Sequence, residues 1–231
     1  MDSCDVVHAI DRLFLKSIPQ SELSHLNLSK IYVGHIEPAF YYYLDFLRAK
    51  NPNVHHFKNL KEFSMAVFKY SQILANLSVD VPREFSAFIV YKRQIPAYGG
   101  ILLNKDNDKV LLVRDNSKNW TFPKGKQMPG ESDINCAKRE VMEETGFDIT
   151  NYVDEAEFIT MQVESGQPRR GRPIETRVLK LYIVRNVPES YNFRPQTINE
   201  ISGLKFYSLN AIPSNNYHIT KFLHPLFERL R

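Results

Sequence analysis

The chain has 231 residues, of which 43% are hydrophobic and 24% are charged, so it is long enough for one large or two modest globular domains. Its two cysteines, Cys4 and Cys136, are too few for a disulfide framework and favour a reducing, intracellular compartment. The sequence has neither an apolar run of about 18 residues nor a signal-peptide pattern, so we expect a protein that is neither secreted nor membrane-bound. The net charge of +4 favours polyanionic partners such as nucleic acid.

The first part of the chain, residues 1–80, is predicted to be helical. Apolar residues recur at helical spacing in three stretches, at 6–13, 36–47 and 60–74. Pro38 lies inside the second stretch. Because proline is tolerated in the first turn of a helix but not in its interior, we expect that helix to begin at Pro38.

The pattern changes at Phe85 to short runs of β-branched and aromatic residues, which are typical of strands. We therefore predict a helical domain over 1–80, a hinge over 81–95 and a mixed α+β domain over 96–231. Strands are expected at 88–91, 99–103, 110–113, 157–163, 177–184 and 204–208, followed by a closing helix at 217–230.

One segment has a highly specific pattern. Residues 125–147 read GKQMPGESDINCAKREVMEETGF. The spacing of their glycines, acids and arginine matches every fixed position of the Nudix box, which is the signature of hydrolases that cleave phosphoanhydrides. The matching residues are Gly125, Glu131, Arg139, Glu140, Val141, Glu143, Glu144, Gly146 and Phe147.

The same segment predicts its own local structure. Ser132 can cap a helix that runs to about Thr145, and Gly146 can end it. Ile134, Ala137 and Val141 form an apolar stripe that would pack this helix on a sheet.

Three glutamates, Glu140, Glu143 and Glu144, fall at i, i+3 and i+4, so their carboxylates converge on one face of the helix. Like charges at this spacing destabilise one another unless a cation neutralises them, and oxygen ligands suit Mg²⁺ or Mn²⁺. An acidic helix face alone is usually only solvated, but the complete box predicts a metal site for hydrolysis of a phosphoanhydride. Glu131 and Arg139 are expected to pair or to orient the ligands.

The chain resembles the catalytic subunits of eukaryotic mRNA decapping enzymes over nearly its whole length. The resemblance implies an α+β protein with an N-terminal all-α domain, then a Nudix α/β/α sandwich with a mixed sheet, and a C-terminal RNA-binding helix over 214–231. It is carried by HIEPAFYYYLDFLRAKNP (35–52), YKRQIPAYGGILLN (91–104), NWTFPKGK (119–126), AKREVMEETGFDIT (137–150), INEISGLKFYSL (198–209) and NYHITKFLHPLFERL (216–230).

This resemblance implies that Glu140, Glu143 and Glu144 bind the metal and that Glu200 is the general base. Without it, Glu200 would be an ordinary acid that caps a loop. The implied substrate is capped mRNA, which is hydrolysed to 7-methylguanosine diphosphate and RNA with a 5′-monophosphate.

The resemblance also implies that Tyr41 and Asp45, with Tyr217, recognise the cap. An aromatic ring and a carboxylate suit a cationic purine. The family usually has tryptophan at the position of Tyr41, and tyrosine stacks more weakly. The alternative is an exposed aromatic residue beside a solvated acid.

Contacts with the body of the RNA are expected to be basic and spread along the chain. Arg169, Arg170 and Arg172 lie in a loop that is equally well explained as a solvated surface loop. The other candidates are Lys92, Arg93, Lys124, Lys126 and Lys221.

The resemblance further implies a small decapping activator subunit on the helical domain, near residues that include Leu13, Phe14, Leu23 and Leu26. It leaves room for other decapping enhancers, and it implies work in the cytoplasm and in processing bodies. The hinge is expected to let the helical domain close over the Nudix face.

Two rival readings remain. One is a Nudix hydrolase of diphosphoinositol polyphosphates or dinucleoside polyphosphates, which would not need about 80 helical residues before the Nudix domain. The other is a cap- or RNA-binding module without activity, and the three glutamates of the box argue against it.

Overall fold

The computed structural model describes residues 1–24, 27–164, 176–196, 200–212 and 217–231. The chain divides into two compact units, Met1–Gln94 and Ile95–Arg231. Within the described ranges, no helix is both long enough and apolar enough to cross a membrane.

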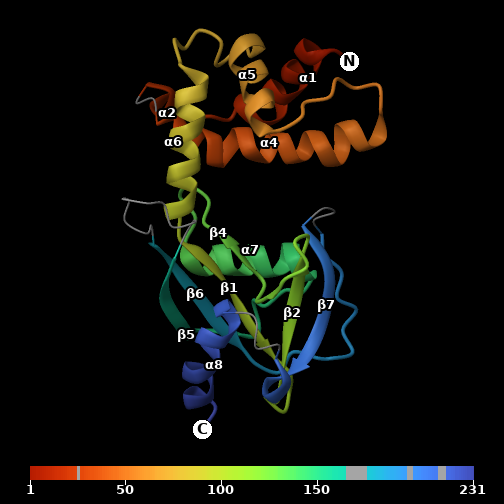
Figure 1. Cartoon of the computed structure of the whole chain (residues 1–231), viewed down its shortest axis with the longest axis vertical. Coiled ribbons are helices and arrows are strands. Elements are labelled where there is room, and N and C mark those ends of the chain that lie inside the picture. The colour runs from red at the N-terminus through yellow and green to blue at the C-terminus, as the bar shows by residue number, and fades with distance from the viewer. Residues whose placement is uncertain (25–26, 165–175, 197–199, 213–216) are drawn as a thin grey trace. The chain divides into compact units, whose positions relative to one another are not determined.

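The described residues of the first unit form helices and no strand (Figure 1), which confirms the all-α prediction for this part of the chain. Some of its turns are of the wider π type, in which an amide bonds to the carbonyl five residues back. The elements are α1 (Ser3–Ile10), η1 (Asp11–Leu15), α2 (Gln20–Ser24), α3 (Leu28–Ile31), η2 (Tyr32–Ile36), α4 (Glu37–Tyr42), η3 (Tyr43–Arg48), α5 (Leu60–Tyr70) and α6 (Val81–Gln94).

The elements α3 to η3 follow one another without a break, so the prediction that a helix begins at Pro38 was wrong. This helix begins at Leu28, after Asn27, whose side chain accepts a hydrogen bond from the amide of Lys30 at 3.3 Å. Pro38 follows the π-type turn of η2, where the amide of Glu37 donates to the carbonyl of Tyr32. A widened turn accommodates a proline ring that would clash in a regular helix.

Tyr43 lies at the centre of the core of this unit and is fully buried. Its ring stacks on Phe40 and Phe63 and meets Phe57 edge to face. The hydroxyl donates to the carbonyl of His55 at 2.6 Å and accepts from the amide of Phe57 at 3.2 Å. The phenol therefore satisfies two backbone groups of a segment that has no helix of its own.

The segment expected to be a hinge, with a strand at 88–91, is helix α6 and belongs to the first unit. Phe88 is fully buried and stacks on Tyr32 with 4.8 Å between ring centroids. Lys92, one turn later, forms an ion pair with Glu37. The strand prediction failed because the periodicity of a short apolar run does not separate strand from helix, and packing against Tyr32 decides in favour of the helix.

Replacing Phe88 with alanine is expected to destabilise the helical unit by about 3–5 kcal/mol, because it opens a cavity beside Tyr32. Hydrogen exchange of amides in residues 1–94 of the whole chain measures the effect. The control is Val90→Ala on the same helix, since Val90 is 40% exposed, and it should change the free energy of unfolding by about 0.5 kcal/mol or less. Equal effects of the two substitutions would mean that α6 is not part of the packed unit.

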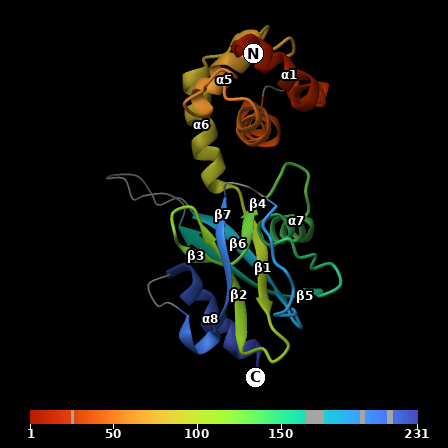
Figure 2. The same cartoon turned by 90° about the vertical axis from the view of Figure 1, so that its right-hand side faces the viewer.

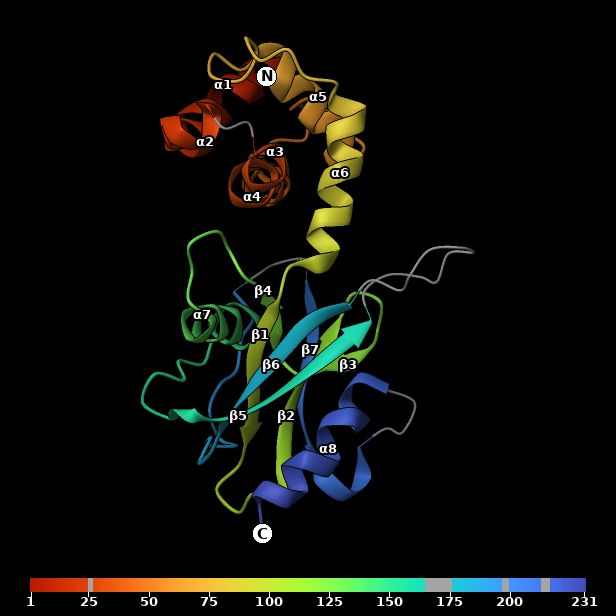
Figure 3. The same ribbon diagram turned by 90° about the vertical axis from the view of Figure 1, so that its left-hand side faces the viewer.

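The second unit is built around a mixed sheet (Figures 2 and 3). Its central order is β3-β2-β1-β6-β5, with β7 paired to β2 and β4 paired to β1. Strands β1 and β6 are parallel and the other described pairs are antiparallel. The strands are β1 (Ala97–Leu103), β2 (Lys109–Asp115), β3 (Trp120–Thr121), β4 (Lys124–Lys126), β5 (Val153–Glu164), β6 (Thr176–Val184) and β7 (Ile201–Ser208).

Two helices, α7 (Asp133–Thr145) and α8 (Tyr217–Arg229), cover opposite faces of this sheet. On the face of α7, Val141 packs in one core cluster with Leu102. On the face of α8, Phe222 packs in another cluster with Ile101. Neighbouring residues of β1 thus point to opposite helices, as the alternation of a strand requires. The predicted α/β/α sandwich with a mixed sheet and a terminal helix is confirmed, and only the short strands β3 and β4 were missed.

Candidate active site

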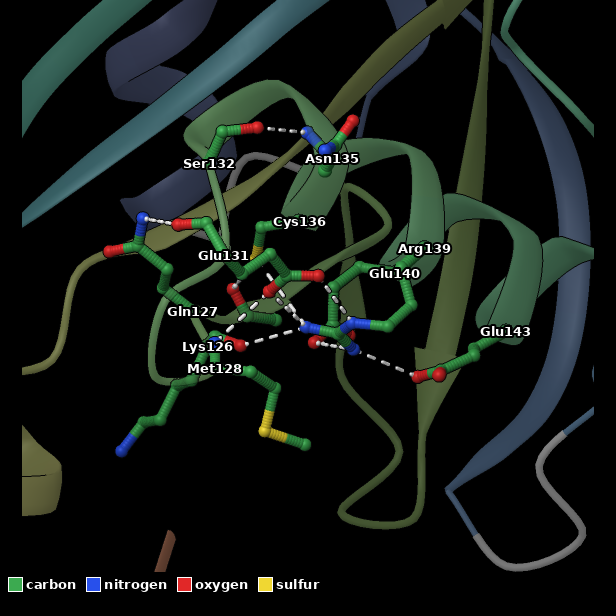
Figure 4. Close-up of polar contacts among 11 residues, drawn as sticks. Lys126, Gln127, Met128, Glu131, Ser132, Asn135, Cys136, Arg139, Glu140 and Glu143 are labelled. Carbon is green, nitrogen blue, oxygen red and sulfur yellow. Dashed lines mark hydrogen bonds and ion pairs between the residues drawn. The ribbon is translucent and has the colours of Figure 1, made fainter. Parts of the chain in front are cut away.

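Helix α7 carries the acidic residues of the site, and its ends form as predicted. The side chain of Ser132 accepts a hydrogen bond from the amide of Asn135 at 3.3 Å (Figure 4). Gly146 has a positive φ of 71°, and its amide donates to the carbonyl of Met142. Ile134, Ala137 and Val141 are buried as the expected apolar stripe, which fixes the rotation of the helix and so the direction of its acids.

Arg139 is the centre of the polar network that Figure 4 shows. Its guanidinium donates to both carboxylate oxygens of Glu131, at 2.8 and 3.0 Å. It also donates to Glu140 at 2.7 Å and to Glu143 at 3.2 Å, and to the carbonyl of Lys126 at 3.1 Å. A planar guanidinium can orient several carboxylates at once, so Arg139 fixes the acids of the loop and of the helix in one arrangement.

The charges in this network shift the pKa values of its members. Burial opposes ionisation of Glu131, but the hydrogen bond from Arg139 holds the pKa of that carboxyl below its usual value. Burial likewise opposes the charge of Arg139, and its acidic partners still raise the pKa of the guanidinium. The pair is therefore ionised at neutral pH.

Glu140 and Glu144 carry the opposite shift. Burial raises the pKa of Glu140 to about 7 and that of Glu144 to about 8. The negative charge of Glu200 acts in the same direction on both, so the structure brings Glu200 to the acids of α7 although more than 50 residues separate them. Arg139 lowers the pKa of Glu140 and Lys124 lowers that of Glu144, but both effects are smaller than the rise.

Strand β4 passes close to these two carboxylates. The amide of Lys124 donates to Glu144 at 3.0 Å. A side chain at position 125 would collide with the carboxylate of Glu140 as it now lies, so a larger residue there would displace that carboxylate. The glycine that opens the box thus leaves room for the carboxylate of Glu140 beside strand β4.

The acids fit a hard divalent cation by their chemistry. Over the described part of the chain, no group of three or more His, Cys, Asp or Glu side chains already has the spacing of a metal site. Burial and, to a smaller extent, the neighbouring acids raise the pKa values of Glu140 and Glu144, so positive charge placed beside them would favour their ionised forms. A divalent ion bound by oxygen atoms would supply that charge.

The predicted cap-binding pair lies on the helical unit. Tyr41 is 44% exposed, and Asp45 is half-buried one helical turn later. Both have further contacts. The side chain of Tyr217, at the start of α8, lies outside what the structure describes, as do Arg169, Arg170, Arg172 and Leu26.

The predicted RNA-contacting cations occupy different environments. Lys92 is held in its ion pair with Glu37, and Arg93, Lys126 and Lys221 are half-buried. Lys124 turns inward: its ammonium donates to the hydroxyl of Thr121 at 2.7 Å, and burial lowers its pKa. Its side chain is therefore only partly exposed to solvent.

A mixed sheet between two helices, with a glycine-led loop and an acidic helix at one end, defines a Nudix hydrolase fold. The chain belongs to the NUDIX family, because the NUDIX domain model matches residues 93–229. A second model, the Dcp2 box A domain, matches residues 5–91, which are the helical unit. Nudix hydrolases generally use a divalent metal ion, in agreement with the donor set.

Three relatives illustrate the similarity. The chain is 31% identical over 219 residues to the Saccharomyces cerevisiae protein named m7GpppN-mRNA hydrolase, covering 91% of this chain and 21% of the relative. It is 32% identical to the mRNA decapping complex subunit 2 of Schizosaccharomyces pombe, covering 90% and 26%. It is 33% identical to the mRNA-decapping enzyme subunit 2 of Arabidopsis thaliana, covering 80% and 47%. The chain thus spans less than half the length of each.

Proposed function

We propose that this protein removes the 5′ cap of mRNA by metal-dependent hydrolysis, releasing 7-methylguanosine diphosphate and RNA with a 5′-monophosphate. The observation that carries the proposal is the joining of two parts in one chain. One is the carboxylate site on α7 of a Nudix unit, and the other is a helical unit that matches the Dcp2 box A domain. A Nudix site alone indicates a class of reaction, and the helical unit indicates which substrate within that class the chain acts on.

The metal would be held by Glu140, Glu143 and Glu144, and Mg²⁺ or Mn²⁺ suits these oxygen donors. When bound there, such an ion would supply the positive charge that makes the phosphorus atom a better electrophile. Arg139 holds the carboxylates in place, and Glu200, beside Glu140 and Glu144, accepts the proton of the attacking water. Glu200 suits this role because it is exposed at the site and can reach water.

The cap base would be recognised on the helical unit. The ring of Tyr41 would stack on the methylated purine, and the carboxylate of Asp45 would pair with its edge. The positive charge of 7-methylguanine strengthens both the stacking and the pairing with a carboxylate. The RNA that follows the cap would contact Arg93, Lys126 and Lys221, together with Lys92 and the loop that contains Arg169 and Arg170.

Substituting tryptophan for Tyr41 is expected to strengthen binding of a 7-methylguanosine nucleotide several-fold, because tryptophan offers the largest ring to a cation. Tyr41→Ala should weaken it about tenfold or more, as the loss of one base stacking contact does. Fluorescence titration with methylated and unmethylated nucleotides measures both. Phe46→Ala is the matched control, since Phe46 is also 44% exposed on the same run of helices. A weakening by Phe46→Ala as large as that by Tyr41→Ala would contradict this assignment.

An activator subunit would bind the helical unit near Leu13, which is 56% exposed, and the adjacent Phe14, with Leu23 as a further candidate. Leu13→Asp should abolish co-purification with that subunit, and retention of the complex would exclude this docking site.

The proposed location of the protein in the cell is the cytoplasm with its processing bodies, and a fluorescent fusion found elsewhere would contradict it.

Hydrolysis of RNA labelled in the cap tests the proposed function. The chain, with Mg²⁺ or Mn²⁺, should release 7-methylguanosine diphosphate from long capped RNA. Diphosphoinositol polyphosphates and dinucleoside polyphosphates are the competing substrates. Cleavage of these without release from capped RNA would assign the chain to the small-molecule hydrolases, and no cleavage of any substrate would leave a binding role.

A further inference from the structure

Residues 191–196 bind the C-terminal end of α7 in the Nudix unit. The amide of Gln196 donates a hydrogen bond to the carbonyl of Glu143 at 2.8 Å, and the amide of Arg194 donates to the carbonyl of Thr145 at 3.0 Å. The last carbonyls of a helix have no partner within the helix itself. This segment, which we call the strap, therefore fixes the last turn of α7 by backbone hydrogen bonds.

The glycine that ends α7 allows the strap to come close. The carbonyl oxygen of Arg194 lies 2.4 Å from the position that a Cβ atom at Gly146 would take, so a side chain there would displace the strap. The hydroxyl of Tyr191 donates to the carbonyl of Gly146 at 2.7 Å. Gly146 thus accommodates the strap in addition to its positive φ at the end of the helix.

Two aromatic residues of the strap join it to the core on the α7 side of the sheet. Tyr191 meets Phe147 edge to face with 4.9 Å between ring centroids. Phe193 contacts Phe147 at 5.7 Å and Phe206 of β7 at 5.9 Å, and all three rings belong to or pack on one core cluster. The strap was not predicted as part of the site, and these alternate aromatic residues were the signal in the sequence that could have identified it.

The strap also lies directly before the proposed base along the chain. Gln196 binds the carbonyl of Glu143, and Glu200 follows four residues later. The next residue, Ile201, is paired with Asp115 in the sheet. Four residues of chain span about 14 Å at most, so attachment of the strap to α7 limits how far Glu200 can move from the acids of that helix.

We propose that Tyr191 and Phe193 are positioning residues of the active site, because the strap that they anchor holds the carboxylates of α7 and Glu200 in one arrangement. The inference rests on the proposed function for the role of Glu200, whereas the positioning of Glu143 and Glu144 does not depend on the substrate. A reaction that requires metal ligands and a base at fixed positions is sensitive to small displacements, since a shift of about 1 Å can lower its rate about a hundredfold.

Two variants remove the anchors of the strap. Tyr191→Phe keeps the ring and loses the hydrogen bond to Gly146, and it should lower kcat for capped RNA about 3- to 10-fold, the usual effect of one hydrogen bond. Phe193→Ala removes the aromatic link and should lower kcat about a hundredfold. KM should change by about twofold or less in both, because the substrate-binding groups remain.

Tyr152→Phe is the matched control. Tyr152 is 38% exposed, close to the 41% of Tyr191, and its ring lies 5.0 Å from the same Phe147 ring, but it lies outside the strap. Its kcat should match that of wild type. Should Phe193→Ala fail to fold, Tyr191→Phe serves in the same measurements with smaller effects.

Binding of Mn²⁺, measured by calorimetry on the whole chain without substrate, tests the arrangement of the carboxylates separately from the reaction. Phe193→Ala should weaken it about 10- to 100-fold, as the loss of groups that orient metal ligands does, and Tyr152→Phe should leave it unchanged. Hydrogen exchange of the amides of Arg194 and Gln196 shows whether the strap has left α7. Faster exchange with unchanged kcat and unchanged affinity for Mn²⁺ would mark a strap that only caps the helix, and would overturn the proposal.

A double variant separates positioning from a general loss of stability. If Phe193 acts through Glu200, Phe193→Ala should lower the single-turnover rate less in a Glu200→Gln background than in the wild type, because the effects of residues that act as a unit are not additive. Equal factors in both backgrounds would show that Phe193 acts independently of the base, and would overturn the proposal.

This inference and the proposed function can fail separately. If the wild type binds Mn²⁺ and the strap variants bind it more weakly, but capped RNA stays intact, the proposed function fails and the positioning of the α7 carboxylates stands. If capped RNA is cleaved with equal kcat by the wild type and both strap variants, the strap proposal fails and the proposed function stands. Absence of both Mn²⁺ binding and cleavage in the wild type would overturn both.

Discussion

Glu144→Gln should reduce the rate of hydrolysis of capped RNA by about a hundred- to a thousandfold, because it removes a negative ligand of the divalent ion that stabilises the charge of the transition state. Glutamine keeps the size of the side chain and can still accept the hydrogen bond from the amide of Lys124. The fold should therefore survive, and the loss should appear in kcat. Single-turnover hydrolysis of cap-labelled RNA over a range of Mg²⁺ concentrations measures it.

The free energy of unfolding distinguishes this loss of activity from misfolding of the variant. Burial raises the pKa of Glu144 to about 8, well above the value of the unfolded chain, which is about 4.3. Between those two pH values the carboxylate favours the unfolded state, where it ionises freely, so in EDTA at pH 7 Glu144→Gln should be at least as stable as wild type. Glu157→Gln, on β5 and paired with Arg185, is the control and should keep full activity. Full activity of Glu144→Gln would remove this residue from the site.

Arg139→Met should lower both stability and activity. It would leave Glu131 and Glu140 partly buried without their cation, and breaking such a pair costs about 3 kcal/mol or more. The side chains of these acids are only 15% and 12% exposed, so water replaces little of the lost interaction. Because Arg139 also orients Glu140 and Glu143, the affinity for the metal should fall about 10- to 100-fold. Urea unfolding in EDTA and titration with Mn²⁺ measure the two effects separately.

Two further variants test whether the lost pairing of Arg139 with the acids causes the loss of stability. Arg139→Lys keeps the charge but cannot bind both oxygens of Glu131 while it contacts Glu140, so it should recover only part of the stability. In the double variant Glu131→Met with Arg139→Met, the loss should be smaller than the sum of the single losses, because the two residues interact directly. Additive losses would show that the pair does not act as a unit.

Local features of the sequence were sufficient for helix α7. A serine cap, a glycine that ends the helix and an apolar stripe depend on residues within a few positions of one another, and the structure has each of them. The same holds for the longer strands, since short runs of apolar and β-branched residues mark β1, β2 and β6 in the sequence. The spacing of Glu140, Glu143 and Glu144 on one helix likewise required no tertiary information.

Predictions failed where a distant residue decides the local structure. Phe88 lies in a helix because Tyr32 offers it a stacking surface, and Pro38 lies within a run of helices because the turn before it widens. Neither partner nor turn type is visible in the residues of the segment itself, so propensity and periodicity gave the wrong answer there.

The electrostatics of the site required the tertiary structure for the same reason. The sequence and its family resemblance identify the site acids Glu140, Glu143, Glu144 and Glu200. Only the structure shows that burial, together with the charge of Glu200, raises the pKa values of Glu140 and Glu144. Lys124 reads as a surface cation in the sequence, but in the structure its side chain is only partly exposed. Desolvation depends on everything that surrounds a charge, and this becomes known only when segments far apart in the chain are packed together.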